Sequence, residues 1–197
     1  MTIDHILKFT AFLHEFRAIE RRVWANTKER LENDAEHSYS LALLAWYINE
    51  VDGLGLDTGK LMKYALAHDL VEVYAGDTWF YQTDQKVLDT KVEKEHAALI
   101  KIKEYFAEFP ELAQIIDEYE KRDNEESRFV YALDKVEPML SIYLDKGRTW
   151  KKNDVTLEKA KAMKIPKVKT HATIDKYFHE LLARLEQEEH ELFPQDK

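Results

Sequence analysis

The chain has 197 residues, of which 45% are hydrophobic and 34% are charged, and this size and composition are those of one ordinary folded domain. The formal net charge of −9 argues against binding to a nucleic-acid polymer, because such binding depends on neutralising many phosphates; a single phosphate can still be captured locally. The chain has no cysteine, so any metal site must use nitrogen and oxygen donors.

Apolar spacing predicts helices along almost the whole chain, and strand-like alternation is scarce. The predicted helices, in chain order, cover residues 3–21, 35–51, 59–75, 86–107 and 111–121, then a long helix that follows the capping-box pattern at Asp123–Glu126 and ends at Gly147, a short helix from Asp154, and residues 170–191. Residues 24–34 and 77–85 are predicted to be loops, and Pro166 is predicted to break the short helix. The predicted fold class is therefore an all-α helical bundle.

Two histidines and two aspartates lie in apolar helical surroundings, where helix formation does not require them. His37 precedes one apolar run, His68-Asp69 interrupts another, and Asp134 follows a third. Burying two imidazoles and two carboxylates in one core is costly unless something satisfies them, and a divalent cation does so directly. We therefore predict a metal site on these four side chains, whose donors suit Mn, Co, Fe, Ni, Zn or Mg without ranking them.

Acidic side chains near the His68-Asp69 pair predict chemistry beside the metal. Glu72 lies four positions after His68 and three after Asp69, so one face of a helix would carry all three. Asp77 follows shortly after, at the predicted end of the same helix. A carboxylate that lies close to a metal without binding it can orient a water molecule or carry its proton, and Glu72 is predicted to do so.

Several other features have two interpretations each. Arg22, at the predicted end of the first helix, either pairs with phosphate oxygens or is an ordinary cation at a helix C-terminus. Asp77 is either a substrate contact or a turn residue, and the aromatic residues 79–81 form either a base-stacking wall or a subunit contact. Lys135 is either a second phosphate contact or a surface lysine, and the surface is the preferred interpretation. The remaining histidines are expected to face solvent: His5, His14, His96, His171, His179 and His190.

Four motifs, taken together, are specific to one family. They are Glu32-Asn33-Asp34-Ala35-Glu36-His37-Ser38, the run from His68-Asp69 to Asp77-Thr78, Lys91-x-x-Lys94-Glu95, and Asp134-Lys135. Over residues 15–146 they resemble the HD-domain superfamily of metal-dependent phosphohydrolases, in the branch that contains the bacterial 5′-deoxynucleotidase (YfbR-like). The resemblance implies an all-α, usually dimeric protein that removes phosphate from nucleoside 5′-monophosphates. It implies metal binding by His37, His68, Asp69 and Asp134, a catalytic water at Glu72, a sugar contact at Asp77 and a phosphate contact at Arg22.

Two positions depart from related patterns. In the deoxynucleotidases a tryptophan directly follows the arginine and favours 2′-deoxy sugars, whereas here Val23 follows Arg22 and Trp24 comes one place later. The guanosine-tetraphosphate hydrolases carry Glu-Asp where this chain has Glu72-Val73, which counts against that substrate. The alternatives that stay open are hydrolysis of a nucleoside triphosphate or a cyclic nucleotide, a metal- and nucleotide-binding sensor without turnover, and a helical interaction module.

The expected organisation is one HD domain over residues 1–197, with its core at about 15–146. The helices over residues 154–191 would pack on this core or on a partner subunit, and a homodimer is expected. The longest apolar stretch, residues 41–48, is far shorter than the roughly 20 residues that a bilayer requires. The first residues carry no basic region ahead of an apolar core, so no signal peptide is expected. We therefore expect a soluble, cytoplasmic protein with a small-molecule nucleotide substrate and no membrane partner.

Overall fold

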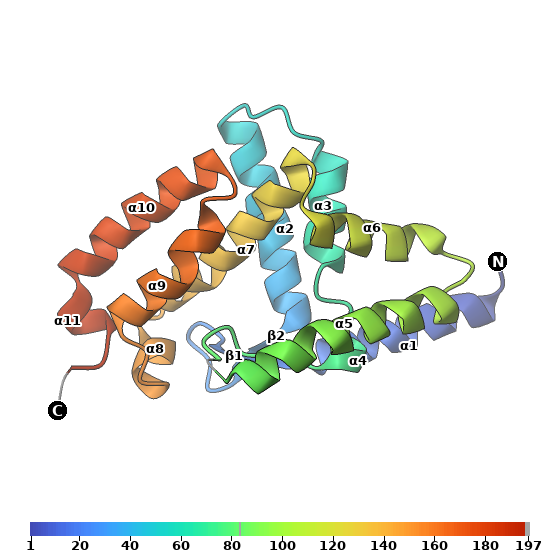
Figure 1. Cartoon of the computed structure of the whole chain (residues 1–197), viewed down its shortest axis with the longest axis horizontal. Helices are drawn as coiled ribbons and strands as arrows, with labels where there is room; N and C mark the ends of the chain where they lie inside the picture. The colour runs from blue at the N-terminus through green and yellow to red at the C-terminus, as the bar shows by residue number, and fades with distance from the viewer. Residues whose placement is uncertain (83, 196–197) are drawn as a thin grey trace.

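The computed structural model describes residues 1–82 and 84–195, in which helices dominate and one short hairpin is the only sheet (Figure 1). The elements, in chain order, are α1 (Ile3–Arg17), β1 (Glu20–Trp24), β2 (Leu31–Asn33), α2 (Asp34–Val51), α3 (Thr58–Ala67), α4 (Glu72–Ala75), α5 (Gln85–Tyr105), α6 (Pro110–Lys121), α7 (Glu125–Leu144), α8 (Arg148–Lys152), α9 (Leu157–Val168), α10 (Ala172–Gln187) and α11 (Glu189–Leu192). The predicted all-α class is confirmed. None of the helices in this described part combines the length and apolar composition that a membrane crossing requires.

The segment predicted as the end of the first helix and the following loop forms an antiparallel hairpin instead. The helix α1 ends at Arg17, and the paired positions of the hairpin are Glu20 with Asn33 and Trp24 with Leu31. These two pairs are four residues apart on β1 but only two apart on β2, so β1 carries a bulge. The prediction is wrong here because a strand of three residues is too short to show the alternation that identifies strands.

The helix predicted over residues 59–75 is also wrong in one respect, because it is interrupted after Ala67. The Glu72 N–H donates to the Asp69 carbonyl at 2.9 Å, which is the i→i+3 pattern of a 3₁₀ turn rather than that of an α-helix. The turn places His68 in the interior and leaves Asp69 at its edge, and this packing overrides the helical periodicity of the sequence.

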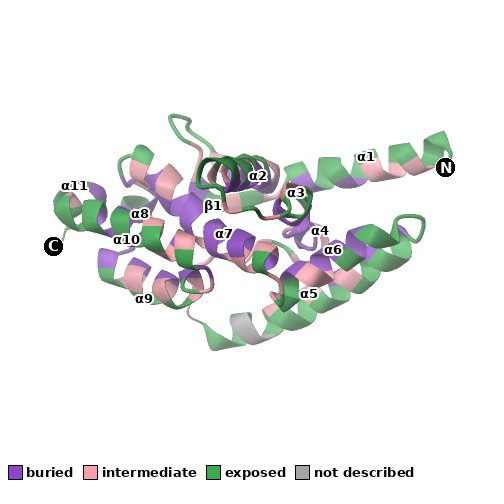
Figure 2. Ribbon diagram, turned by 90° about the horizontal axis from the view of Figure 1, so that it is seen from above, coloured by how far each residue is buried: buried purple, intermediate pink, exposed green. Residues whose placement is uncertain are grey.

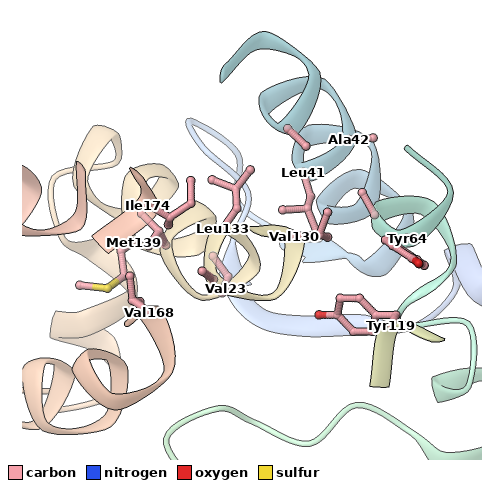
Figure 3. Packing of buried hydrophobic residues seen from close by; sticks show 14 of the residues in the cluster. Val23, Leu41, Ala42, Tyr64, Tyr119, Val130, Leu133, Met139, Val168 and Ile174 are labelled. Atoms are coloured by element: carbon pink, nitrogen blue, oxygen red, sulfur yellow. The ribbon is translucent and has the colours of Figure 1, made fainter. Parts of the chain in front are cut away.

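The central helix of the molecule is α7. It contacts α2, α3, α6, α9 and α10, and Figure 2 shows it buried along much of its length between α2 and α9. In Figure 3, Leu41 of α2 lies against Val130 of α7, and Met139 of α7 lies near Val168 of α9; all four side chains are fully buried. This core fixes α2 relative to α7, and these two helices carry the first and last of the predicted metal ligands.

The helices α9 and α10 both pack on α7 of the same chain. Pro166 lies inside α9 and does not break it, contrary to the prediction, because α9 ends at Val168 and the proline removes only one hydrogen bond near that end. His171, expected to face solvent, is buried, and its ring packs edge-on against Phe129 with the ring centroids 5.0 Å apart. The apolar packing of α10 on the core accounts for this burial.

The short helix α8, which the sequence does not predict, packs against the C-terminal end of the chain. The rings of Trp150 and Phe193 stack with their centroids 4.4 Å apart. Gly147 precedes α8 with a φ of +71°, and a Cβ atom there would lie 1.8 Å from the carbonyl oxygen of Leu192. Only glycine fits at this position, because the backbone of the C-terminal segment lies directly on it.

Candidate metal centre

The four predicted metal ligands come from three segments and meet in the interior. His37 lies near the start of α2, His68 and Asp69 lie in the turn after α3, and Asp134 lies in the middle of α7. His37 Nε2 is 2.9 Å from Asp134 Oδ1, and His68 Nε2 is 3.0 Å from Asp69 Oδ2. Donor atoms of His37, His68 and Asp69 all lie within 4.8 Å of one another. An ion at about 2.0–2.2 Å from each ligand separates opposite donors by about 4 Å, which is comparable to the spacing of the donor atoms of His37, His68 and Asp69.

Each imidazole is oriented through its other ring nitrogen. Nδ1 of His37 lies 2.9 Å from Oε2 of Glu137, and Nδ1 of His68 lies 3.0 Å from the Ala65 carbonyl. Metal-binding histidines almost always have such a partner. Nε2 of His68 is buried and, within the described residues, makes no hydrogen bond of acceptable geometry, although a carboxylate lies nearby. A buried, unsatisfied ring nitrogen beside carboxylates fits a divalent cation.

In the metal-free cluster, protons on the histidines occupy the positions that a cation would take. Burial lowers the pKa of His68, but the charges of Asp69 and Asp134 more than offset this effect and raise the pKa to about 10. Burial raises the pKa of Asp134, but Lys135 and the two histidines hold it well below its ordinary value. Protons on the imidazoles therefore supply positive charge to the metal-free cluster, and a metal ion must displace them.

Glu72 lies beside this cluster in a group of carboxylates. Donor atoms from Asp34, Asp69 and Glu72 lie within 4.8 Å of one another, and Asp34 and Glu72 are buried. Burial, and after it the charges of Asp69, Asp34 and Asp77, raise the pKa of Glu72 well above its ordinary value. A carboxyl group whose pKa is raised in this way holds a proton more readily than an ordinary carboxyl group, which suits it to take a proton from water. Asp77, predicted as a sugar contact, lines the same cavity as Glu72.

Two neighbouring arginines of β1 line this cavity. Adjacent residues of a regular strand point to opposite faces, but β1 is irregular between Glu20 and Trp24, and both arginine side chains line the cavity. Arg21 Nη1 lies 3.0 Å from Asp69 Oδ2 and 3.2 Å from Asp34 Oδ1, while the Arg22 guanidinium lies over the Trp79 ring, 5.2 Å from its centroid. The prediction that Arg22 ends a helix is wrong, since it lies in β1. Sequence reasoning missed Arg21, whose one signal is its place beside Arg22.

Lysines and aromatic rings complete the lining of the cavity. Lys135, expected at the surface, instead forms an ion pair with Asp134 and lines the cavity, because α7 faces the core on this side. Lys164 and Lys167 of α9 reach the same cavity, and the sequence contains no motif that identifies them. The three consecutive aromatic residues also line it, which favours the base-stacking interpretation over a subunit contact: Trp79, Phe80 and Tyr81.

The chain is similar to a known family and to known proteins. A family model described as an HD domain matches residues 13–175. The chain is 28% identical over 138 residues to the mouse (Mus musculus) protein named 5′-deoxynucleotidase HDDC2, covering 68% of this chain and 67% of that protein. It is 28% identical over 149 residues to the Dictyostelium discoideum protein of the same name, covering 72% and 77%. A crystal structure from Magnetospirillum magnetotacticum MS-1, described as a predicted metal-dependent phosphohydrolase, superposes with a TM-score of 0.79 at 26% identity, covering 97% of this chain and 99% of that one.

Proposed function

This chain belongs to the HD-domain family, and we propose that it is a divalent-metal-dependent phosphohydrolase that releases phosphate from nucleoside 5′-monophosphates. The observation that carries the proposal is the convergence of two imidazoles and two carboxylates beside a cavity that two arginines also line. The similarity to two proteins named 5′-deoxynucleotidase, and to a structure described as a metal-dependent phosphohydrolase, supports the same reaction.

The proposed chemistry assigns one role to each group. A divalent cation held by His37, His68, Asp69 and Asp134 would neutralise charge on the phosphoryl oxygens and lower the pKa of a water molecule. Glu72 takes the proton of the attacking water as the water oxygen bonds to phosphorus. The bond between phosphorus and the 5′ oxygen breaks, and that oxygen receives a proton from solvent while Glu72 releases the proton it took, so that a nucleoside and inorganic phosphate result.

The arginines and Asp77 bind the substrate in this proposal. Arg22 has no ion-pair partner among the described residues, and stacking on Trp79 leaves its guanidinium edge available to phosphate oxygens. Arg21 is already held by Asp69 and Asp34, so it fixes the position of those carboxylates and adds positive charge near the phosphate. Asp77, which follows α4 and lines the cavity, would accept a hydrogen bond from the sugar.

The tryptophan near the arginines does not take the sugar-selecting position. The ring of Trp24 is covered by the side chain of Lys152, whose Nζ lies 3.6 Å from the ring centroid, and Trp24 is not among the described residues that line the cavity. Val23, which directly follows Arg22, does line it. A valine offers no hydrogen bond and less bulk than an indole, so we propose that the site accepts ribose as well as deoxyribose.

We further propose that residues 1–197 form a single domain, that it acts as a homodimer, and that it works in the cytoplasm. Exposed apolar side chains on α2 and α7 support the homodimer, because a contiguous apolar face of this kind marks an interaction surface: Tyr39, Leu43, Tyr47, Val51 and Leu144. The absence of cysteine fits a reducing compartment. Analytical ultracentrifugation of the whole chain tests the oligomeric state.

A phosphate-release screen tests the proposed reaction. Purified protein would be assayed with ribo- and deoxynucleoside 5′-monophosphates in the presence of Mn²⁺, Co²⁺, Mg²⁺ or Zn²⁺, and metal content would be measured by elemental analysis. We expect Asp69→Asn to lose both bound metal and turnover, while the exposed control Asp123→Asn keeps both. Turnover that survives chelation of all divalent ions would refute the metal-dependent mechanism.

A further inference from the structure

Three lysines gather around one aromatic ring in the cavity. Nζ of Lys164 lies 3.5 Å from the centroid of the Phe80 ring, Nζ of Lys167 lies 4.3 Å from it, and Nζ of Lys135 lies 5.9 Å from it. Lys135 comes from α7 and the other two lysines come from α9, so the cluster is assembled from two helices that pack together. All four residues line the cavity.

Lys164 is the most unusual member of this cluster. Its exposed fraction is 3%, and within the described residues it forms neither an ion pair nor a hydrogen bond. A buried lysine ordinarily extends its ammonium group to the surface or to a carboxylate, since an unpaired buried charge is costly. Burial, and after it the charges of Lys135 and Lys167, lower the pKa of Lys164 well below its ordinary value. Lys135 is paired with Asp134, whereas Lys164 and Lys167 form no ion pair within the described residues, so these two amines of the cavity lining are available to an anion, whose charge would favour their protonation.

The phosphate that reacts at the metal has other cations available. Arg22 stacks on Trp79 and Arg21 is bonded to Asp69, so both arginines lie on the β1 side of the cavity lining, whereas Lys164 belongs to α9. The arginines of β1 and the lysines around Phe80 therefore form two separate groups of cations. A single phosphate group does not need both. An anion with two charged groups would contact the arginines with one and the lysines with the other.

We propose that Lys164 and Lys167, together with Lys135, form a second anion subsite that holds a phosphate group other than the one released. Nucleoside 5′-monophosphates are then the slower substrates, and a nucleotide with two phosphate groups is preferred. In a nucleoside 3′,5′-bisphosphate the bond to the 5′ oxygen breaks, as in the monophosphates. In a nucleoside 5′-diphosphate the bond between the terminal phosphorus and the bridging oxygen breaks, water supplies the new oxygen, and a nucleoside 5′-monophosphate leaves. This inference rests on the proposed phosphohydrolase activity and specifies its substrate class. The Phe80 ring holds the ammonium groups together through cation–π contacts when the subsite contains no anion.

The test compares substrates and variants in the metal-loaded protein. Values of kcat/KM would be measured for a nucleoside 5′-monophosphate, the matching 3′,5′-bisphosphate and the matching 5′-diphosphate. We expect one of the two doubly phosphorylated nucleotides to be preferred, and Lys164→Met to reduce that preference by about 10- to 100-fold, the loss expected for one hydrogen bond to a charged group. Lys164→Arg should retain most of the preference. Lys169→Met, an exposed lysine at the end of α9, is the matched control.

Two outcomes would overturn the proposal. In the first, Lys164→Met loses the same factor of kcat/KM for singly and doubly phosphorylated substrates, which would show that the lysines bind the released phosphate. In the second, the unaltered protein shows no preference between these substrates, which would show that no second subsite exists.

A binding measurement separates this proposal from the proposed reaction. Calorimetric titration of the unaltered protein and of Lys164→Arg with inorganic pyrophosphate and with inorganic phosphate requires no turnover, and it covers the case in which Lys164→Met does not fold. Tighter binding of pyrophosphate than of phosphate supports the subsite even if no nucleotide is hydrolysed, whereas equal binding counts against it whether or not monophosphates are hydrolysed.

Discussion

Replacing Glu72 by glutamine separates proton transfer from metal binding. The side chain keeps its size, so packing around α4 is preserved, but the group can no longer accept a proton. General acid–base groups contribute about 10²- to 10⁴-fold to rate. We expect kcat of Glu72→Gln to fall by about 10³-fold, or about 4 kcal/mol of barrier, because Asp34 is held by Arg21 and cannot replace the lost carboxylate. Steady-state phosphate-release assays measure kcat, and elemental analysis checks that the metal content is unchanged.

The same variant makes a prediction about stability that has a definite sign. The pKa of Glu72 is raised in the folded protein, so its ionisation opposes folding once the pH rises above the ordinary value of 4.5. The metal-free Glu72→Gln variant should therefore have a higher Tm than the metal-free parent at pH 8, and the difference should shrink as the pH falls toward 4.5. The exposed control Glu158→Gln should show neither effect. A kcat within threefold of the parent would remove Glu72 from the mechanism, and a lower Tm at pH 8 would contradict the account of its environment.

Three further predictions concern the metal, the fold and the sugar. Because the pKa of His68 is raised to about 10 in the metal-free cluster, protons compete with the metal, and the dissociation constant for Mn²⁺ measured by calorimetry should decrease from pH 6.5 to pH 8.5; a constant value would contradict this competition. Gly55→Ala, at a φ of +73° with open space around it, should cost about 1–2 kcal/mol in urea unfolding. Gly147→Ala should cost clearly more, because its Cβ would lie 1.8 Å from the Leu192 carbonyl oxygen, and equal costs would show that this contact relaxes freely. With Val23 beside Arg22, kcat/KM for matched ribo- and deoxynucleotides should differ by less than about 100-fold, and a larger ratio would require another sugar-selecting group.

The sequence predicted the helical class, and it singled out four side chains that the structure brings close together, because each signal is local. The apolar helical segments contain four polar side chains: His37, His68, Asp69 and Asp134. Burying such groups costs free energy unless a partner binds them, whatever the arrangement of the helices. That the four meet in space could be inferred only from their chemistry, since nothing in the spacing of residues fixes the crossing of α2 and α7. Geometry within the cluster depends on tertiary packing, as the 3₁₀ turn before Glu72 demonstrates.

The features that the sequence did not predict depend on contacts between distant segments. Arg21 and Arg22 are neighbours with the same chemistry, and the sequence does not reveal the irregular pairing of β1 with β2 in the segment where both line the cavity. Lys164 lies in a helix rich in lysine, and periodicity does not separate a buried lysine from the exposed Lys169. The distinction arises from the packing of α9 against α7, which brings one lysine to the Phe80 ring.

Both ring nitrogens of His37 contact acidic side chains of one helix, α7. Asp134 lies 2.9 Å from one nitrogen and Glu137 lies 2.9 Å from the other, and the two acids are three positions apart on the same face of α7. Any rotation of α7 about its axis would pull on both contacts at once. Conservative substitutions in the core under α7 should therefore weaken metal binding before they unfold the chain. Metal affinity then reports small changes in the position of α7.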